Sequence, residues 1–375
     1  MKKNIRKIVL EDGSVYTGIG FGCMENRKAE IVFNTSMAGY QEILSDPSYT
    51  DQAVVMTYPL IGNYGMCEED YETSRPSMTA MIVREYCEIP SNFRCTKTLD
   101  EVMKEYGIVG IQGIDTRKLT RHIRTVGSCR AYLVDESYDT RKAVRELWNW
   151  VPGTDAVPRV STKEIYEFSL DPTYDTLPGI REVTGIAETK KPHVVVIDCG
   201  IKHNILRQMA ARGMRLTVVP WDTPAKTIEE LRPDGIFISN GPGDPTYVQE
   251  TIHTIRTLMG SCPIFGICLG HQIIALACGA QTYKLKFGHR GGNHPVKNLT
   301  TGRIEITSQN HSYAVLEESL KDTGLQVTHR NLLDQTIEGL ADERKAVFSV
   351  QYHPESAPGP QDSAYLFDQF MEMMH

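Results

Sequence analysis

The C-terminal half of the chain alternates short apolar runs with amphipathic segments. The apolar runs at 193–197, 215–219, 235–239 and 263–267 are rich in β-branched residues and predict buried strands, and the segments between them predict helices at 204–212, 227–231 and 252–259. Alternation at this spacing predicts βαβ units, with a mostly parallel sheet and helices on both of its faces. Ligands bind beyond the carboxyl ends of such strands, so the residues after each run are the first candidates for a site.

The N-terminal third has a different pattern, in which strands come close together. The runs 7–10 and 14–20 flank Asp12-Gly13, a dipeptide typical of a hairpin turn. We expect Ser36 and Asp115 to cap helices. The other expected elements are strands at 29–35, 52–58 and 77–86 and helices at 36–44, 99–106 and 113–124. The pattern predicts a mixed α/β domain of structural or interface character. The basic residues of 113–124 fit a solvated face and a partner interface equally well.

A polar stretch punctuated by prolines separates the two patterns. Its five prolines are Pro152, Pro158, Pro172, Pro178 and Pro192. Weak periodicity and frequent proline are typical of a linker. We therefore expect an N-terminal domain over residues 1–152, a linker over 153–191 and a C-terminal domain over 192–375.

Composition and charge narrow the class of protein. The formal charge of -7 is spread over 375 residues without long runs of one sign, which argues against a nucleic-acid partner. No apolar run approaches the roughly 20 residues of a membrane span, and no apolar segment of a signal peptide follows the basic N-terminus. The nine cysteines are odd in number and show no C-x-x-C spacing, so we expect a cytoplasmic protein with reduced thiols and no metal site.

The stretch 263–272 carries the strongest chemical signal. An apolar strand leads into Gly266-Ile267-Cys268-Leu269-Gly270, the thiol version of the G-x-S-x-G nucleophile elbow, and a helical segment follows. Small neighbours are needed because a nucleophile on a strand-to-helix turn has a crowded backbone. The N–H groups at the start of the helix would favour the thiolate of Cys268. The alternative interpretation is an unreactive cysteine in a buried strand.

Two further stretches follow other predicted strands. Asn240-Gly241-Pro242-Gly243 comes after the run 235–239, where it is either a simple turn or a source of backbone N–H groups for a developing oxyanion. His353-Pro354-Glu355 follows an apolar run and offers a base with an orienting carboxylate. It is a better base candidate than the rival histidines, of which the main ones are His271, His289, His294 and His311. Cys268, His353 and Glu355 together suit acyl transfer through a thioester.

These three stretches resemble the class I glutamine amidotransferases. Further stretches are similar to the small-subunit family of the carbamoyl-phosphate synthetases in particular, and this resemblance covers nearly the whole chain. Those stretches are 39–44, 57–65, 113–117 and 287–296. The resemblance implies an N-terminal small-subunit domain followed by an amidotransferase domain with a mostly parallel, doubly wound, flavodoxin-like sheet.

The resemblance also implies roles for individual residues. Cys268 would attack the side-chain amide of glutamine, His353 would move protons, Glu355 would orient His353, and ammonia would be released. The implied glutamine pocket comprises Ser48, Gly241, Gly243, Leu269, Gln272, Asn310, Ser312 and Tyr313. Ser312 and Tyr313 stand where glycine and phenylalanine are common in the family, and Ser36 and Ala38 also depart from its usual residues.

The chain shows no G-x-x-x-x-G-K-[ST] loop and no carboxylate cluster suited to magnesium and phosphate. We therefore expect no cofactor on this chain, with ATP and Mg²⁺ on a large synthetase subunit that receives the ammonia for the arginine and pyrimidine pathways. Two alternatives remain open. One is a glutaminase subunit of another synthetase, such as those for anthranilate or GMP, and the other is a catalytically silent regulatory subunit.

Overall fold

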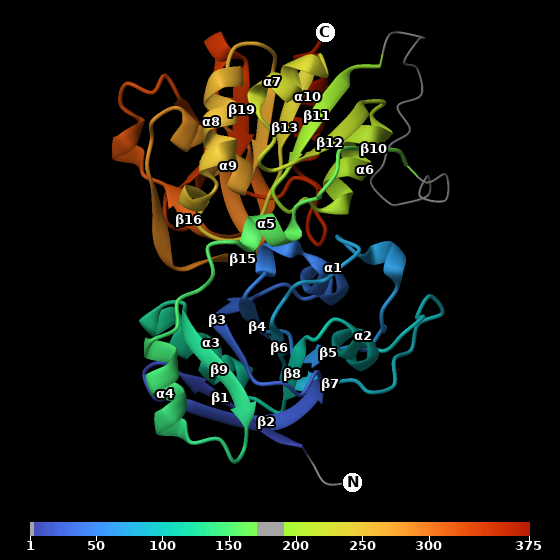
Figure 1. Cartoon of the computed structure of the whole chain (residues 1–375), viewed down its shortest axis with the longest axis vertical. Coiled ribbons are helices and arrows are strands. Elements are labelled where there is room, and N and C mark those ends of the chain that lie inside the picture. The colour runs from blue at the N-terminus through green and yellow to red at the C-terminus, as the bar shows by residue number, and fades with distance from the viewer. Residues whose placement is uncertain (1–3, 171–190) are drawn as a thin grey trace. The chain divides into compact units, whose positions relative to one another are not determined.

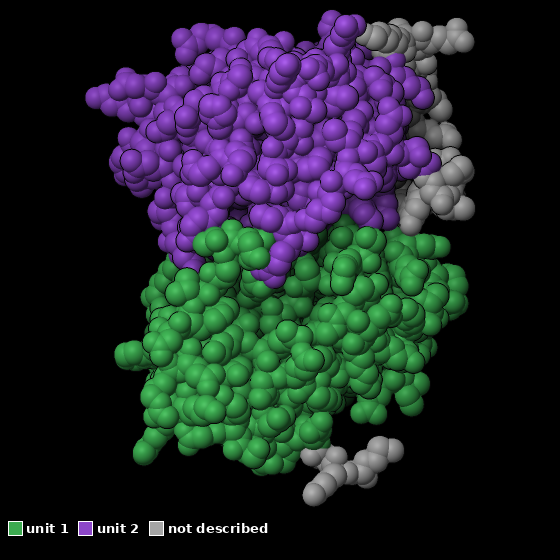
Figure 2. Space-filling view, viewed as in Figure 1, with its two compact units in different colours: residues 1–156, 286–291 green, residues 157–285, 292–375 purple. Residues whose placement is uncertain are grey.

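The computed structural model describes residues 4–170 and 191–375, which form two compact units (Figure 2). Unit 1 runs to residue 156 and also includes residues 286–291. Unit 2 comprises residues 157–285 and 292–375. Among the described helices, none combines the length and the apolar character needed to cross a membrane.

Unit 1 is built on a closed barrel with the strand order β1-β2-β8-β6-β4-β3-β9 (Figure 1). The barrel strands are β1 (Ile5–Leu10), β2 (Val15–Gly22), β3 (Arg27–Asn34), β4 (Gln52–Met56), β6 (Ala80–Ile82), β8 (Val109–Gln112) and β9 (Cys129–Asp135). The other elements are the strand pair β5 (Leu60–Ile61) and β7 (Glu85–Tyr86) and the helices α1 (Tyr40–Ser45), α2 (Leu99–Glu105), α3 (Thr116–Val126) and α4 (Thr140–Trp148). Closure leaves the barrel strands without an unpaired edge.

The side-chain alternation of the strands explains how the barrel is packed. In β3, Ile31 and Phe33 join one apolar cluster, whereas Val32 between them joins a second one. The first cluster also includes Leu119 and Ile123, the buried apolar residues of α3. Both sides of the barrel wall therefore pack against apolar groups, which is why β3 has three apolar residues in succession, Ile31, Val32 and Phe33.

Most of the elements expected in unit 1 are present. The hairpin is confirmed, since β1 pairs antiparallel with β2 on either side of Asp12-Gly13. Asp115 caps α3 through its carboxylate, which accepts a hydrogen bond from the Lys118 backbone N–H at 2.9 Å. The cap predicted at Ser36 is wrong, because α1 begins after Gly39, which is its N-cap and has no side chain to cap it. The single strand expected over 77–86 is also wrong, since β6 and β7 belong to two different sheets.

Unit 2 contains a ten-stranded sheet in the order β10-β12-β11-β13-β14-β19-β18-β17-β15-β16 (Figure 1). Its strands are β10 (Tyr166–Phe168), β11 (His193–Asp198), β12 (Arg215–Pro220), β13 (Gly235–Ile238), β14 (Ile264–Ile267), β15 (Thr282–Asn298), β16 (Ile304–Val315), β17 (Gln326–Asn331), β18 (Ile337–Asp342) and β19 (Val347–Val350). The five strands β12, β11, β13, β14 and β19 pair in parallel, and antiparallel strands extend this core on both sides.

Helices cover both faces of the sheet, as the doubly wound prediction requires. They are α6 (His203–Ala211), α7 (Ala225–Glu230), α8 (Gln249–Leu258), α9 (Leu269–Ala277) and α10 (Tyr365–Glu372). Ile228, Ile255 and Ile273 bring α7, α8 and α9 into the cluster on one face. Leu206 and Phe367 bring α6 and α10 into the cluster on the other face. This arrangement leaves the carboxyl ends of the parallel strands free for a site.

The stretch expected to be a linker contains two described elements. Helix α5 (Ala156–Val160) comes first, and β10 then pairs antiparallel with β12 and forms the edge of the unit 2 sheet. A three-residue edge strand in a polar stretch gives too short a pattern to be recognised in the sequence. The remainder of the expected linker, 171–190, lies outside the described residues.

Candidate active site

Cys268 occupies a strained position between a strand and a helix. Strand β14 ends at Ile267, and Cys268 follows with φ 55° and ψ -101° as the N-cap of α9. A side-chain-bearing residue rarely adopts a positive φ, and such strain persists only where the surroundings enforce it. The thiol is buried, and its sulfur lies 3.5 Å from the carbonyl oxygen of Asn310. The predicted nucleophile elbow therefore has the expected strand–turn–helix geometry.

The two glycines of the elbow are required by contacts with backbone. A Cβ on Gly270 would lie 2.2 Å from the carbonyl oxygen of Ile238 at the end of β13. A Cβ on Gly266 would lie 2.7 Å from the carbonyl group of Gly270. Neither contact could be relieved by a side-chain rotation, because the opposing atoms belong to the main chain. The glycine spacing thus lets α9 start directly against the neighbouring strand.

The loop after β13 lies against the start of α9. A Cβ on Gly241 would be 2.2 Å from the carbonyl oxygen of Cys199 and 2.8 Å from the side chain of Leu269. Gly243 has a φ of 87°, a conformation that favours glycine. Close contact between Gly241 and Leu269 puts this loop beside the residue that follows Cys268. That position suits the donation of backbone N–H groups to an oxyanion.

His353 lies three residues after the end of β19, the strand that pairs with β14. Its backbone N–H donates to the carbonyl oxygen of Ser308 at 2.9 Å, and its side chain is buried. The Nδ1 atom lies 2.7 Å from Oε1 of Glu355, so the carboxylate fixes the ring with Nε2 as the atom left for proton transfer. The structure therefore brings the predicted base and its orienting acid into hydrogen-bond contact.

Lys202 joins this group, although no motif in the sequence indicates it. Its Nζ donates to Oε1 of Glu355 at 2.7 Å, and both side chains are buried. The ammonium also donates to the carbonyl oxygen of Ala357. The backbone N–H of Lys202 is held by Oδ1 of Asn240 at 3.2 Å, which ties the lysine to the loop before Gly241. Lysine is almost never fully buried without a charged partner, and Glu355 is that partner here.

Charge coupling sets the protonation states of the group. Burial alone raises the pKa of Glu355, but the charges of Lys202 and His353 outweigh it and lower the pKa to about 2. Burial alone lowers the pKa of His353, but Glu355 and Cys268 raise it well above its ordinary value of 6.5. A carboxylate that stays charged and an imidazole that readily becomes charged are the pair needed to take a proton from a thiol.

The residues of the predicted glutamine pocket fall into two groups. In unit 2, Gln272 donates from Nε2 to the carbonyl oxygen of Tyr313 at 2.8 Å, and Asn310 faces the Cys268 sulfur through its own carbonyl oxygen. Ser312, which lies between Asn310 and Tyr313 in the sequence, is partly buried. Gln272 thus holds the backbone of the segment that carries Ser312 and Tyr313. Ser48 belongs to unit 1, where its backbone N–H donates to Asp46, and its role in the pocket stays a prediction.

The rival histidines have other surroundings. His271 is fully buried in α9, its Nδ1 lies 2.9 Å from the Ser349 hydroxyl, and burial lowers its pKa to about 3. A histidine that stays neutral at every physiological pH is a poor proton carrier. His271 therefore packs the elbow helix against β19.

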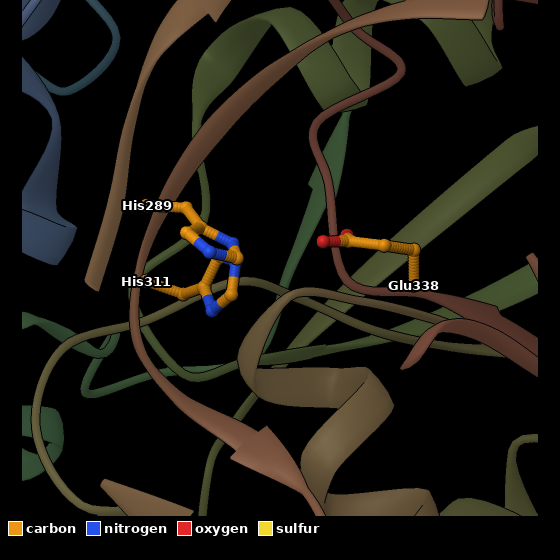
Figure 3. A group of neighbouring side chains, drawn as sticks. All are labelled: His289, His311 and Glu338. Carbon is orange, nitrogen blue, oxygen red and sulfur yellow. The ribbon is translucent and has the colours of Figure 1, made fainter. Parts of the chain in front are cut away.

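Two of the other rival histidines lie beside a buried carboxylate. Ring nitrogens of His289 and His311 and the carboxylate of Glu338 lie within 4.8 Å of one another (Figure 3). The Glu338 carboxylate accepts hydrogen bonds from Asn331 and Gln309, at 3.1 and 3.0 Å. The two ring nitrogens of His311 lie 2.8 and 2.9 Å from carbonyl oxygens. His311 and Glu338 thus belong to a buried polar network, in which both ring nitrogens of His311 have partners.

Two family matches cover the two units. Residues 8–133 match the family "Carbamoyl-phosphate synthase small chain, CPSase domain", and residues 195–373 match "Glutamine amidotransferase class-I". The carbamoyl phosphate synthase small chain of Fusobacterium nucleatum is 49% identical over 98% of this chain and 97% of its own length.

The chain belongs to the carbamoyl phosphate synthase small-chain family. Two other members of the family match this chain over the same share of its length. The pyrimidine-specific small chain of Halalkalibacterium halodurans is 50% identical, and the small chain of Syntrophotalea carbinolica is 51% identical, each over 98% of this chain and 97% of the relative. The predicted family and fold class are thereby confirmed, with an amidotransferase domain on the doubly wound sheet.

Proposed function

We propose that this chain is the glutaminase subunit of a glutamine-dependent carbamoyl-phosphate synthetase. The observation that supports it most is the buried chain of contacts from Lys202 through Glu355 to His353, beside a cysteine held at positive φ. Membership of the small-chain family supports the same conclusion. The geometry serves acyl transfer, and glutamine is the amide that the amidotransferase family name implies.

The reaction begins with proton transfer from the Cys268 thiol to Nε2 of His353. The thiolate attacks the side-chain carbonyl carbon of glutamine, and a C–S bond forms as the carbonyl electrons move onto oxygen. Backbone N–H groups of Leu269 and of the Gly241–Gly243 loop stabilise this oxyanion. The tetrahedral species collapses, the C–N bond breaks, and His353 returns the proton to the departing nitrogen, so that ammonia and a glutamyl thioester result.

Water completes the cycle. His353 takes a proton from the water, whose oxygen attacks the thioester carbonyl carbon, and the C–S bond breaks to give glutamate and the Cys268 thiolate. His353 then returns its proton to the thiolate, which restores the thiol for the next turnover. Glu355 keeps the imidazole oriented in both halves of the reaction, and Lys202 keeps Glu355 ionised. The ammonia passes to the large synthetase subunit, on which we place ATP and Mg²⁺, for synthesis of carbamoyl phosphate from bicarbonate. This chain then needs no cofactor of its own.

The test is ammonia release from glutamine by the wild-type chain and by Cys268→Ser, each with and without the large subunit. Cys262→Ser is the matched control, because it makes the same atomic change at a partly buried thiol outside the elbow. We expect release that depends on Cys268 and rises with the partner. Failure of the wild type to release ammonia even beside an active large subunit would favour the silent regulatory subunit, with Ser312 and Tyr313 as the altered pocket wall.

A further inference from the structure

An open pocket of about 540 Å³ lies in unit 1, against the basic helix α3. Its lining comes from the exposed face of α3 and from β2, and it includes Tyr16, Arg117, Lys118, Arg121, His122 and Thr125. All of the described lining residues belong to unit 1, whereas the nucleophile elbow belongs to unit 2. The volume falls in the range of small-molecule sites, and no step of the proposed glutamine hydrolysis uses this pocket.

Tyr16 forms one wall of the pocket together with two side chains of α3. The Nζ atom of Lys118 lies 5.9 Å from the centroid of the Tyr16 ring. The ring of His122 meets the Tyr16 ring edge-on, with centroids 6.4 Å apart. Nε2 of His122 also lies 2.8 Å from Oδ2 of Asp12, in the turn between β1 and β2. The hairpin therefore fixes this wall of the pocket against α3.

Three cations of the pocket have no partner of opposite charge. The side chains of Arg117, Lys118 and Arg121 are exposed, and they form no ion pair with any described residue. Arg117 and Arg121 lie one helical turn apart, a spacing at which like charges destabilise a helix. Because the chain as a whole carries a formal charge of -7, this group of unpaired cations is a local exception. The cations are accessible and can bind an anion from solution.

The charges that line the pocket match a dianion. Asp115 is the only carboxylate among the described lining residues, and it caps α3 by accepting the backbone N–H of Lys118 at 2.9 Å. Three cations and this one carboxylate leave an excess of two positive charges. A phosphate monoester carries close to two negative charges at neutral pH, and arginine binds phosphate through paired hydrogen bonds.

The lining differs from the core of a protein interface. No aliphatic residue is among the described lining residues, and the rings of Tyr16 and His122 are the only aromatic groups among them. Interface cores are depleted of charged side chains and enriched in apolar ones. The pocket and its charges therefore favour a small anionic ligand over a protein partner for this part of the basic segment 113–124.

We propose that this pocket binds a small organic molecule through a phosphate monoester group. The guanidinium groups of Arg117 and Arg121 and the ammonium group of Lys118 bind the phosphate oxygens, and the organic part lies against the ring of Tyr16. A phosphate suits two arginines better than a carboxylate because it offers three oxygens and a second charge. The inference does not depend on the glutaminase proposal.

The test is calorimetric titration of the full chain with phenyl phosphate, inorganic phosphate and phthalate. Low ionic strength limits the screening of exposed charges, and at about pH 8 the phosphate ester is a dianion. We expect one phenyl phosphate per chain, bound about tenfold more tightly than inorganic phosphate, which lacks the ring, or phthalate, which is a dianion without phosphate. No saturable binding of phenyl phosphate, or equal affinity for either of the other two anions, would overturn the proposal.

A matched pair of double variants separates the pocket from net charge. Arg117→Gln with Arg121→Gln should weaken the binding of phenyl phosphate at least about tenfold, because charge-assisted hydrogen bonds are lost. Arg141→Gln with Arg145→Gln removes two exposed arginines at the same spacing on α4, outside the pocket, and should leave the affinity within about twofold. Equal losses in the two double variants would mean that net charge alone attracts the anion, and the proposal would be wrong.

A last titration decides between a ligand site and a partner interface. The complex with the large synthetase subunit is isolated by size-exclusion chromatography and titrated with phenyl phosphate, for the wild type and for the Arg117 and Arg121 double variant. The difference between these two complexes is binding at the pocket, whatever the large subunit itself binds. We expect the tenfold difference to persist, and its disappearance in the complex would assign this face to the partner and overturn the proposal.

Discussion

Two cysteines of unit 2 follow parallel strands of the same sheet and are both buried, yet their surroundings differ. Cys199 comes after β11 and Cys268 after β14. Burial raises the pKa of the Cys199 thiol, and the neighbouring Asp198 raises it further. Cys268 instead caps a helix at positive φ and lies beside His353. A position at the end of a parallel strand is therefore not sufficient to make a cysteine reactive, because a reactive thiol also needs the start of a helix and a base beside it.

The largest expected difference comes from exchanging sulfur for oxygen at the two positions. Cys268→Ser should lower kcat for ammonia release by at least about a thousandfold, because serine in this setting is a far weaker nucleophile. Cys199→Ser should keep kcat within about threefold of wild type, since it only alters packing behind the Gly241 loop. Steady-state ammonia assays on both variants measure this difference. Similar losses of kcat in the two variants would contradict the proposed difference between Cys268 and Cys199.

The next largest loss of kcat is expected from substitution of an elbow glycine. Gly270→Ala puts a Cβ against the Ile238 carbonyl, so the start of α9 must shift and kcat should fall about a hundredfold. Gly279→Ala adds a methyl group where no atom lies within 4 Å, although its φ of 93° costs about 1–2 kcal/mol of stability. Comparing kcat and urea unfolding for the pair separates misplacement of Cys268 from simple destabilisation. Normal activity in Gly270→Ala would contradict the geometric account.

Lys202→Met tests the positioning role of the buried ammonium. Breaking a buried ion pair costs about 3–5 kcal/mol of stability, and kcat should fall roughly tenfold as Glu355 loses its partner. Lys226→Met removes an exposed lysine paired with Glu230 and should change neither quantity appreciably.

The pH dependence distinguishes this role from a merely structural one. The lowered pKa of Glu355 contributes stability above its ordinary value of 4.5, and that stability is lost as the pH falls toward 2. Without Lys202, burial raises the pKa, so the carboxylate takes up its proton at a higher pH. The acidic limb of the kcat/KM profile should therefore move to higher pH in Lys202→Met. An unmoved limb would mean that Lys202 acts only through packing.

The smallest effect is expected at His271. Replacement by Asn should keep kcat within about twofold, because a neutral buried imidazole takes no part in proton transfer. The lost contact with Ser349 should cost about 1–2 kcal/mol in chemical denaturation. The same substitution at the proposed base, His353→Asn, should abolish turnover. A large loss of kcat in His271→Asn would reopen the choice of base.

The sequence was most informative where the chemistry is local. The elbow around Cys268 and the pair His353 and Glu355 lie within short segments, so spacing alone indicated them. Lys202 could not be found in this way, because its burial depends on contact with Glu355, 153 positions away along the chain. The Ser36 cap failed for a local reason, since the glycine at 39 starts α1 later than a serine cap would.

The pattern of apolar and polar residues could not predict which strands pair over long distances in the sequence. The hairpin of β1 and β2 was predictable from Asp12-Gly13, but closure of the barrel depends on parallel pairs such as β3 with β4 and β6 with β8. Nor does the apolar pattern of 282–298 indicate that its middle part, 286–291, groups with unit 1. Pairing of this kind is decided by packing of the whole domain.

The central claim, that Cys268 forms a thioester assisted by His353, is tested most directly by trapping that intermediate. The wild-type chain with its large subunit is mixed with glutamine, quenched in acid within milliseconds to seconds and analysed by intact and peptide mass spectrometry. The account predicts a glutamyl group on the Cys268 peptide of the wild type and none on that of His353→Asn. A turning-over enzyme with no adduct on Cys268 at any quench time, or with the adduct on another cysteine, would contradict it.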